Sequence, residues 1–248
     1  MRIEALTGLG LVRKENEDSI FVDKENGYYI VADGMGGHKQ GKTASLLAVE
    51  EAVSFLQKHS NLTIHERLEG SIQAANTAVY QENCKQEDFI VDPEKFGMGT
   101  TILIAILEGN KLHIAHVGDT RAYALRKGKL EQLTKDHSFV NKLLDEGLIT
   151  EDEALIHPEK NVLTRALGFH LEIKADTLTD TVEKGSCFIL CSDGVYNLIS
   201  KKNLVSILQQ NEDLVSKLKG IEKQILLNGA KDNYSLIILC TNEEVANG

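Results

Sequence analysis

The sequence has little positive charge and no long apolar run, and each shortage excludes a class of protein. It carries 27 Lys and Arg against 37 Asp and Glu, a formal net charge of −10 at pH 7. Nonspecific binding to nucleic acid or to an anionic membrane needs a positive surface, so neither partner is expected. No apolar run approaches the roughly 18 residues of a membrane helix, and residues 1–4 lack the apolar stretch of a signal peptide. We therefore expect a cytoplasmic protein.

Cysteine is also scarce, and its placement does not resemble a disulfide framework. The chain has four cysteines, Cys84, Cys187, Cys191 and Cys240, and the last three lie inside apolar runs typical of buried strands. Scattered cysteines in such runs favour reduced structural thiols over disulfides or a zinc site.

Few features divide the chain into separate parts. Only two prolines, Pro93 and Pro158, interrupt it, and no repeat, linker or low-complexity stretch is visible. With 248 residues, 42% of them hydrophobic, the chain can bury one substantial core. We expect a single domain over residues 1–242 and a short C-terminal tail, 243–248.

The hydrophobic periodicity predicts an α+β fold. Short apolar runs joined by tight turns predict antiparallel strands at 20–22, 28–32, 101–107, 112–117, 122–125, 187–191 and 236–240. Apolar residues at helical spacing predict helix pairs at about 44–56 with 64–79 and 201–209 with 213–227. Each pair would cover one sheet face, which gives a four-layer α-β-β-α sandwich with two antiparallel sheets inside.

Residues 137–168 differ from the segments around them. They are polar in several stretches and contain His157-Pro158 and a capping box, Thr150 to Glu153, that begins a short helix. We expect this segment to be an insertion lying over the sandwich.

Acidic residues recur where the predicted strands end. Asp33, Asp119 and Asp193 each follow a strand and each adjoin a glycine, and Asp232 precedes the last strand. One Asp-Gly pair is usually only a turn. Four strand-end carboxylates in one place would repel one another unless cations neutralised them, and carboxylate and carbonyl oxygens suit magnesium and manganese. Spacing alone does not show that they converge.

A charged segment near the N-terminus has two interpretations. Arg13 lies five residues before Asp18. Its planar guanidinium suits bidentate contact with a phosphate, while Glu17 and Asp18 could hold metal-bound water. Without the other motifs, a solvated charged loop would be the simpler interpretation.

Together these motifs resemble the PPM-type protein phosphatases, especially their compact bacterial members. The matching blocks follow the family's order along nearly the whole chain, and each block alone would be weak evidence. They are residues 13–18 (R-x-x-N-E-D), 33–38 (D-G-M-G-G-H), 117–121 (V-G-D-T-R), 133–138 (L-T-K-D-H-S), 161–168 (N-V-L-T-R-A-L-G), 192–194 (S-D-G) and 232–233 (D-N).

The resemblance implies hydrolysis of phosphoserine and phosphothreonine in proteins at a centre of two Mn²⁺ or Mg²⁺ ions, with a weaker third ion. Asp33 matches the ligand that bridges two ions, and the Gly34 carbonyl matches a ligand of the second ion. Asp193 and Asp232 match the carboxylates that complete the first site. Asp119 resembles the acid that holds the third ion together with Asp193.

The remaining positions also acquire roles through the resemblance. Glu17 and Asp18 match the acidic pair that binds the second ion directly or through water, and Arg13 matches the phosphate-binding arginine. Residues 137–168 occupy the place of the family's flap, which influences substrate choice. The implied partners are phosphorylated proteins and an opposing Ser/Thr kinase, and we expect a monomer.

The implied mechanism needs no protein nucleophile. Two cations about 3.5–4 Å apart lower the pKa of a bridging water toward neutrality, so hydroxide attacks phosphorus in line. We assign Asp18 and His38 to catalysis. His38 is a candidate acid for the leaving oxygen, although it is as readily a loop histidine, and a metal-bound water could replace it.

Three rival interpretations lead elsewhere. Residues 36–43 satisfy the P-loop pattern G-x-x-x-x-G-K-[ST], completed by Lys42, which points to a nucleotide hydrolase. Such enzymes need a parallel sheet, whereas this chain predicts hairpins. A cysteine-based phosphatase is excluded because no cysteine has an arginine six residues later. An inactive binding module of the same fold would be expected to lose metal carboxylates, which are all present.

Two strand histidines give no metal signal. His113 and His116 fall on opposite faces of a regular strand, so they are not expected to bind one ion together.

Overall fold

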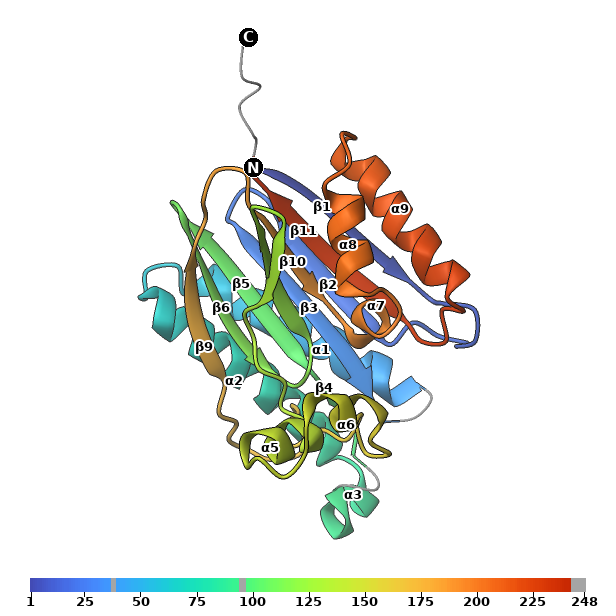
Figure 1. Cartoon of the computed structure of the whole chain (residues 1–248). Helices are drawn as coiled ribbons and strands as arrows, with labels where there is room; N and C mark the ends of the chain where they lie inside the picture. Colours follow the sequence, from blue (N-terminus) through green and yellow to red (C-terminus); the bar gives the residue numbers. More distant parts are fainter. Residues whose placement is uncertain (37–38, 94–96, 242–248) are drawn as a thin grey trace.

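Two β-sheets stack face to face between two layers of helices (Figure 1). The computed structural model describes residues 1–36, 39–93 and 97–241. The predicted four-layer α+β sandwich is confirmed, and every strand pair within the described residues is antiparallel.

The first sheet has six strands and lies against the N-terminal helices. In order across the sheet its path is β2 (Asp18–Asp23), β3 (Tyr28–Met35), β5 (Ile102–Glu108), β6 (Lys111–Val117) and β9 (Asp176–Thr181), with β4 (Gly99–Thr100) paired to the end of β3. Its outer face is covered by α1 (Lys39–Lys58) and α2 (Ile64–Asn83).

The second sheet has five strands and lies against the C-terminal helices. In order across the sheet they are β1 (Arg2–Gly8), β11 (Tyr234–Cys240), β10 (Cys187–Cys191), β7 (Arg121–Arg126) and β8 (Lys129–Gln132). Its outer face is covered by α7 (Asp193–Tyr196), α8 (Lys201–Leu208) and α9 (Leu214–Leu227).

Side chains alternate between the two faces of a strand, so each sheet contributes apolar side chains both to the inter-sheet core and to the helices that cover it. Ile30 and Ile104 point toward α1 and α2, whereas Tyr29 and Leu103 point into the space between the sheets. Phe188 reaches the same inter-sheet core from the second sheet. Both faces of the central strands are therefore buried, which is why these strands read as continuous apolar runs.

The polar segment 137–168 lies at one end of the sandwich (Figure 1). It contains α5 (Phe139–Asp145) and α6 (Glu151–Ile156), and the predicted capping box is present between Thr150 and Glu153. We call residues 137–168 the flap. Below it in the same view lies the short α3 (Glu87–Val91).

The antiparallel sheets also decide against the P-loop interpretation. Although β3 is followed by α1, the neighbours of β3 are the antiparallel strands β2, β4 and β5. A P-loop enzyme needs the parallel sheet that crossover connections build. Lys42 lies exposed on α1, on the side of Lys14 and Asn16.

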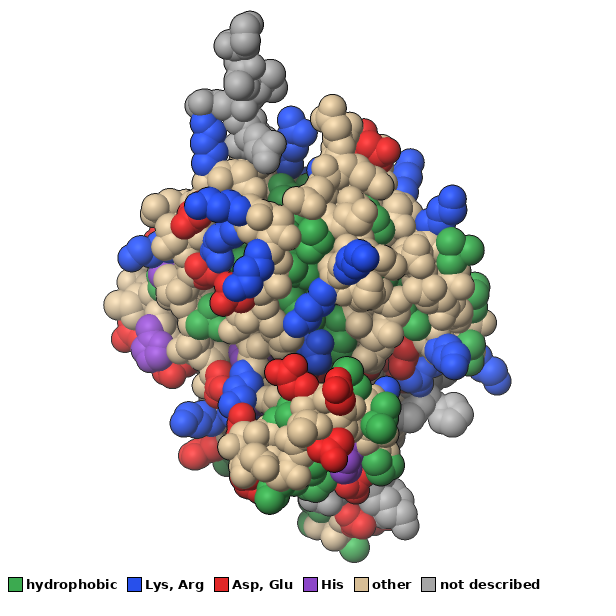
Figure 2. Space-filling model, viewed as in Figure 1, with side chains coloured by type: hydrophobic (Ala, Val, Ile, Leu, Met, Phe, Trp, Pro, Cys, Tyr) green, Lys and Arg blue, Asp and Glu red, His purple; other side chains and the backbone are tan. Residues whose placement is uncertain are grey.

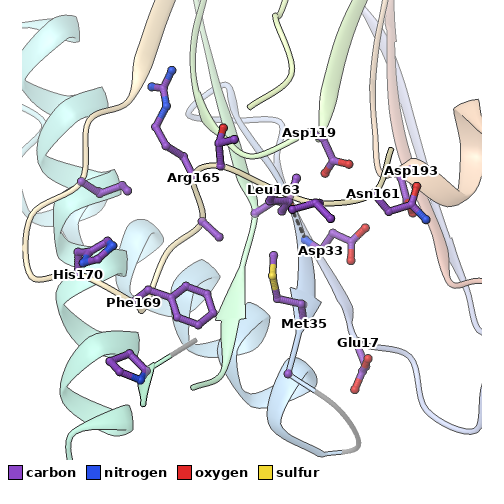
Figure 3. A pocket seen from close by; sticks show the side chains of 18 of the residues that line it. Glu17, Asp33, Met35, Asp119, Asn161, Leu163, Arg165, Phe169, His170 and Asp193 are labelled. Carbon is purple, nitrogen blue, oxygen red and sulfur yellow. Dashed lines mark hydrogen bonds between the residues drawn. The ribbon is translucent and has the colours of Figure 1, made fainter. Parts of the chain in front are cut away.

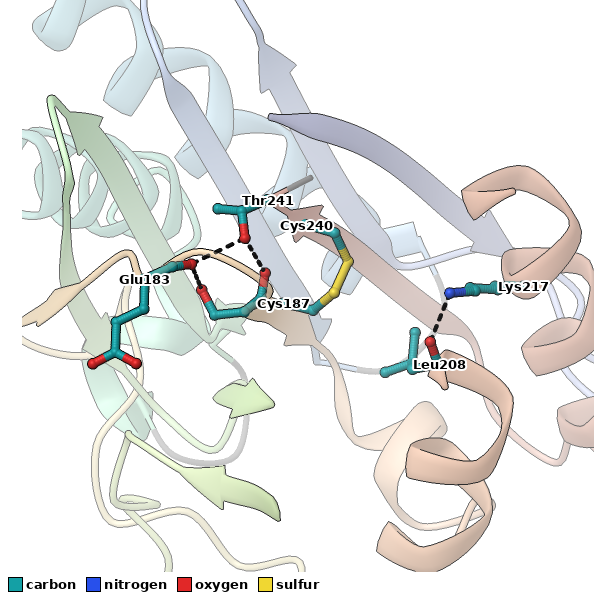
Figure 4. Close-up of a disulfide and its surroundings, with 7 residues drawn as sticks. Glu183, Cys187, Leu208, Lys217, Cys240 and Thr241 are labelled. Atoms are coloured by element: carbon teal, nitrogen blue, oxygen red, sulfur yellow. Dashed lines mark hydrogen bonds between the residues drawn. A yellow bond between two sulfur atoms is a disulfide. The ribbon is translucent and has the colours of Figure 1, made fainter. Parts of the chain in front are cut away.

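The expectation of reduced thiols is wrong for two of the four cysteines. Cys187 on β10 and Cys240 on β11 are direct cross-strand partners, with Cα atoms 4.1 Å apart, and form a disulfide (Figure 4). Their separation of 53 residues gave no sign of this pairing, because it depends on the register between two strands. Cys84 and Cys191 are free thiols.

Candidate metal centre

Four strand-end carboxylates line a single pocket at one end of the sandwich, although they lie far apart in sequence. Asp33 comes from β3 in the first sheet, whereas Asp193 follows β10 and Asp232 precedes β11 in the second. Asp119 lies in the turn from β6 to β7, which joins the two sheets. The pocket has a volume of about 950 Å³. Figure 3 shows Asp33, Asp119 and Asp193 pointing into it from different strands.

The backbone at Asp33 is fixed by two threonines of the neighbouring strand. The amide of Asp33 donates to the Thr101 hydroxyl at 3.0 Å, and its carbonyl accepts from the Thr101 amide at 2.9 Å. The Thr100 hydroxyl donates to the same carbonyl at 2.9 Å. These contacts hold the base of the carboxylate rigidly at the sheet edge.

Close backbone approach explains the glycines beside Asp33 and Asp193. A Cβ at Gly34 would lie 2.1 Å from the carbonyl oxygen of Gly41, and one at Gly194 would lie 1.8 Å from the carbonyl oxygen of Asn233. No other residue fits at such distances. The close contact at Gly194 places the backbone that carries Asp193 directly beside the backbone that carries Asp232.

Asp119 is oriented by a tyrosine that the sequence motifs did not single out. The Tyr196 hydroxyl donates to Asp119 Oδ2 at 3.1 Å. The guanidinium of Arg121 stacks on the Tyr196 ring, 3.6 Å from its centroid, and is itself held by Asp136 through donor–acceptor distances of 2.6–3.0 Å. Tyr196 lies one helical turn after Asp193, which is the only signal for it in the sequence.

Asn233 ties the N-terminal loop to the same site. Its side-chain oxygen accepts from the Glu17 amide at 2.9 Å, and its side-chain nitrogen donates to the carbonyls of Leu9 and Glu15 at 2.9 and 3.1 Å. The loop so held carries Glu17 and Arg13, which both line the pocket. Asn233 belongs to the D-N block at 232–233, whose sequence alone predicts no role for it.

Arg13 lies at the mouth of the pocket, bound to one of the carboxylates. Its Nη2 donates to Asp232 Oδ2 at 2.7 Å, and its side chain is 47% exposed. The hydrogen bond to Asp232 raises the pKa of Arg13, so its positive charge is secure. Arg13 is thus placed to meet an anionic ligand that enters the pocket.

The carboxylates raise one another's pKa. Burial, followed by the charges of Asp18, Asp193 and Asp119, raises the pKa of Asp33 well above its ordinary range. Burial and the charges of Asp119 and Asp232 raise the pKa of Asp193 to about 7.

Burial also raises the pKa of Asp119, to about 6. An acidic cluster of this kind is unfavourable when ionised and needs nearby positive charge. The donor set, all oxygen, fits a hard divalent cation such as Mg²⁺ or Mn²⁺.

Asp18 does not line the pocket. It is the cross-strand partner of Asp33 in the β2–β3 pair, lies only 8% exposed, and accepts a 2.8 Å hydrogen bond from the Ser192 hydroxyl at Oδ2. Ser192 Oγ in turn accepts from the Ser235 amide at 3.0 Å. Burial raises the pKa of Asp18 to about 6. Asp18 therefore joins the two sheets directly behind Asp33.

Gly34 and Glu17 line the pocket beside Asp33. His38, the candidate acid, lies outside the described residues, and so does the predicted tail 243–248. The flap contributes a wall of the pocket through residues 161–166.

A second group of side chains with metal-binding chemistry lies outside the pocket. His116 is buried on β6, on the face that was predicted to be opposite to that of His113. Its ring stacks on the ring of His137, with centroids 4.7 Å apart. His137 Nδ1 accepts from the Gly118 amide at 3.0 Å, so its proton resides on Nε2, which faces Asp176 Oδ2 at 3.3 Å. A protonated nitrogen does not bind a metal, and we interpret this group as a stacked histidine pair beside Asp176.

Comparison with known proteins agrees with this geometry. Residues 13–225 match the family model for protein phosphatase 2C. The chain is 35% identical over 242 residues to the serine/threonine phosphatase Stp of Listeria monocytogenes, covering 96% of this chain and 95% of that protein.

A second relative is longer than this chain. The chain is 34% identical over 238 residues to the serine/threonine protein phosphatase PstP of Mycobacterium tuberculosis, covering 96% of this chain but only 44% of PstP. The chain thus spans less than half the length of PstP.

The structural comparison agrees with the sequence comparison. The catalytic domain of PstP, solved in complex with two manganese ions, superimposes with a TM-score of 0.81 at 32% identity, covering 96% of each chain. The family match extends over most of the chain, and it includes the strand ends that carry Asp33, Asp119 and Asp193. The chain belongs to the protein phosphatase 2C family.

Proposed function

We propose that this chain hydrolyses phosphoserine and phosphothreonine in proteins, at a centre of two divalent cations. The observation that carries the proposal is the convergence of Asp33, Asp193 and Asp232, together with Arg13, in one pocket. The named activity of the relatives supports it, as do the manganese ions bound by the PstP catalytic domain.

The pocket residues divide into ligands for the two cations. We propose that Asp33 bridges the cations, that Asp193 and Asp232 complete the first site, and that the Gly34 carbonyl belongs to the second, with Glu17 contributing directly or through water. When bound, Mn²⁺ or Mg²⁺ ions supply Lewis acidity toward the attacking water and neutralise the phosphoryl oxygens.

Asp119 supplies a further carboxylate near Asp193, and its charge contributes to the raised pKa of Asp193. We propose that these two side chains hold a third, weaker cation. Tyr196 orients Asp119 for this role through its hydroxyl. Asp18 is the cross-strand partner of Asp33 and does not line the pocket, so we propose that it serves catalysis indirectly, through the hydrogen bond that it accepts from the Ser192 hydroxyl.

Arg13 positions the substrate. A guanidinium has five N–H donors, so Arg13 can hold Asp232 and contact phosphoryl oxygens at the same time. The buried, preorganised charges lower the cost of aligning the phosphoryl group with the attacking water. We propose His38 as the group that protonates the leaving seryl or threonyl oxygen.

The names of the relatives as Ser/Thr phosphatases support a proposal for the biological setting. We propose that the substrates are phosphorylated proteins of the cytoplasm, that a Ser/Thr kinase opposes this activity, and that the chain acts as a monomer. Within residues 1–36, 39–93 and 97–241, none of the helices has the length and apolar character of a membrane span.

The proposal is tested by phosphate release from a phosphothreonine peptide, with and without manganese. Wild type should require the metal, and Asp33→Asn should lose nearly all turnover while its far-UV circular dichroism spectrum is retained. Near-wild-type turnover of Asp33→Asn at saturating manganese would contradict the assignment. Hydrolysis of ATP that depends on Lys42, without peptide hydrolysis, would favour the nucleotide-hydrolase alternative.

A further inference from the structure

The pocket that contains the carboxylates has a second end with different chemistry. At the end away from Asp119 and Asp193, Figure 3 shows the ring of Phe169, with Met35 and Leu163 between the two ends. The pocket volume of about 950 Å³ is near the upper limit of ordinary ligand pockets, about 300–1,000 Å³. We call this second end, together with the apolar flap wall that leads to it, the apolar end; its apolar lining residues are Met35, Val91, Pro93, Val162, Leu163 and Phe169, and Arg165 and His170 also line the pocket there.

The inner wall of the apolar end is held in place by α2. A Cβ at Gly99 would lie 2.4 Å from the Phe169 ring, so the ring lies directly against this backbone. The preceding residue, Gly168, donates its amide to Asn76 Oδ1 at 3.0 Å, and its carbonyl accepts from Asn83 Nδ2 at 2.9 Å. Phe169 is therefore fixed before any ligand arrives, which lowers the entropy cost of binding.

The rim of the apolar end exposes hydrophobic side chains from two separate elements. Val91, at the end of α3, is 82% exposed, and Val162, in the flap, is 47% exposed. Figure 2 shows further apolar side chains among acidic ones on the surface of the flap. Apolar side chains that are exposed but line a pocket gain free energy when a ligand covers them.

We propose that the apolar end binds a bulky apolar side chain, such as leucine or phenylalanine, within three residues of the phosphorylated residue in the substrate. The inference rests on the proposed function, since the phosphoryl group occupies the carboxylate end. The inference is supported by the fact that both ends belong to one pocket. A polypeptide whose phosphate lies beside Asp33 therefore extends its neighbouring side chains toward the apolar end. An extended chain advances about 3.3 Å per residue, with side chains two apart on the same face.

This inference concerns specificity and not the chemical step. A phosphoryl group alone makes no use of an apolar wall, because it is charged and strongly hydrated. A small substrate such as p-nitrophenyl phosphate has no neighbouring residues. Its turnover therefore checks that each variant retains the chemical step, and the ratio of kcat/KM between leucine and serine peptides reports the apolar end.

The test uses phosphothreonine peptides of equal length and charge, with leucine or serine at each position from −3 to +3. The variants Val91→Asp and Val162→Asp place a charge on the rim. The matched controls Ile90→Asp and Ile156→Asp introduce the same charge at residues that are 70% and 83% exposed, on α3 and in the flap, but do not line the pocket. Each kcat/KM is divided by that of p-nitrophenyl phosphate with the same enzyme.

Wild type should prefer leucine over serine by about tenfold at one or more positions, in the range that a partly buried apolar group gives. This preference should fall below about threefold in both rim variants and persist in both controls. Equal rates for all peptides, or equal loss of preference in the controls, would overturn the inference while leaving the proposed function intact. A wild type that cleaves neither peptides nor p-nitrophenyl phosphate with manganese would overturn the proposed function itself.

Discussion

Replacing Asp193 by asparagine should stabilise the metal-free protein while it removes activity. Burial and the charges of Asp119 and Asp232 raise the pKa of Asp193 to about 7, compared with about 3.9 for a free aspartate. A rise of about three units corresponds to about 4 kcal/mol against the ionised folded state. Water in the open pocket screens part of this repulsion, so we expect a gain of about 2 kcal/mol, or about 4–8 °C in Tm.

The pH dependence of this effect has a definite sign. Because the folded-state pKa of Asp193 lies above the unfolded one, protonation favours the folded state, and this stability is lost as the pH rises from about 4 through about 7. Asparagine does not ionise. The advantage of Asp193→Asn should therefore be largest at pH 8 and disappear near pH 4.

The assay is thermal unfolding in chelator at pH 4, 6 and 8, followed by circular dichroism. Asp88→Asn, at an exposed position of α3, is the matched control and should change Tm little. Manganese should raise the Tm of wild type more than that of Asp193→Asn, since a ligand stabilises only the state that binds it. If Asp193→Asn unfolds below wild type at pH 8 in chelator, repulsion among the carboxylates is not the dominant effect.

Three further perturbations test separate parts of the structure. Arg13→Ala should raise KM for phosphopeptides about tenfold with a smaller change in kcat if the guanidinium binds phosphate as proposed; steady-state kinetics showing the full loss in kcat would contradict this. Gly194→Ala should cost about 2–3 kcal/mol in urea unfolding, since its Cβ would lie 1.8 Å from the Asn233 carbonyl oxygen, and an unchanged midpoint would refute the close contact. Reducing the Cys187–Cys240 disulfide, whose cysteines are 53 residues apart, should lower the free energy of unfolding by about 4 kcal/mol, and dithiothreitol should have no such effect on the Cys187→Ser/Cys240→Ser protein.

The fold class was predictable because the central strands and the long helices carry strong periodic signals. Four strands of the described residues were not predicted: β1, β8 and β9, which lie at sheet edges, and the two-residue β4, which pairs with the end of β3. An edge strand such as β9 buries few side chains and reads D-T-L-T-D-T, with partly buried and exposed positions alternating. Its pairing depends on the neighbouring strand, which a local pattern does not reveal.

Most residues that line the pocket beside Asp33 were named from the sequence, but Asp18 does not line it, His38 lies outside the described residues, and the assembly of the site was not predictable. Strand-end position identified Asp33 and Asp193, and the family resemblance supplied their roles. The hydrogen bond from Tyr196 to Asp119 and the pairing of Cys187 with Cys240 depend on which segments become neighbours after folding. Hydrophobic periodicity indicates which face of its own strand or helix a side chain occupies. It contains no information on the register between strands that are distant in sequence.

The division of the carboxylates between the sheets has a consequence for folding. Asp33 belongs to β3 of the first sheet, Asp193 and Asp232 flank strands of the second, and Asp119 lies in the turn that joins β6 of the first sheet to β7 of the second. Neither half could form the proposed site alone, so cation affinity should emerge only when the two halves dock. An ion added during refolding would then stabilise the two sheets only after they have docked. It would leave the formation of each separate hairpin unaffected.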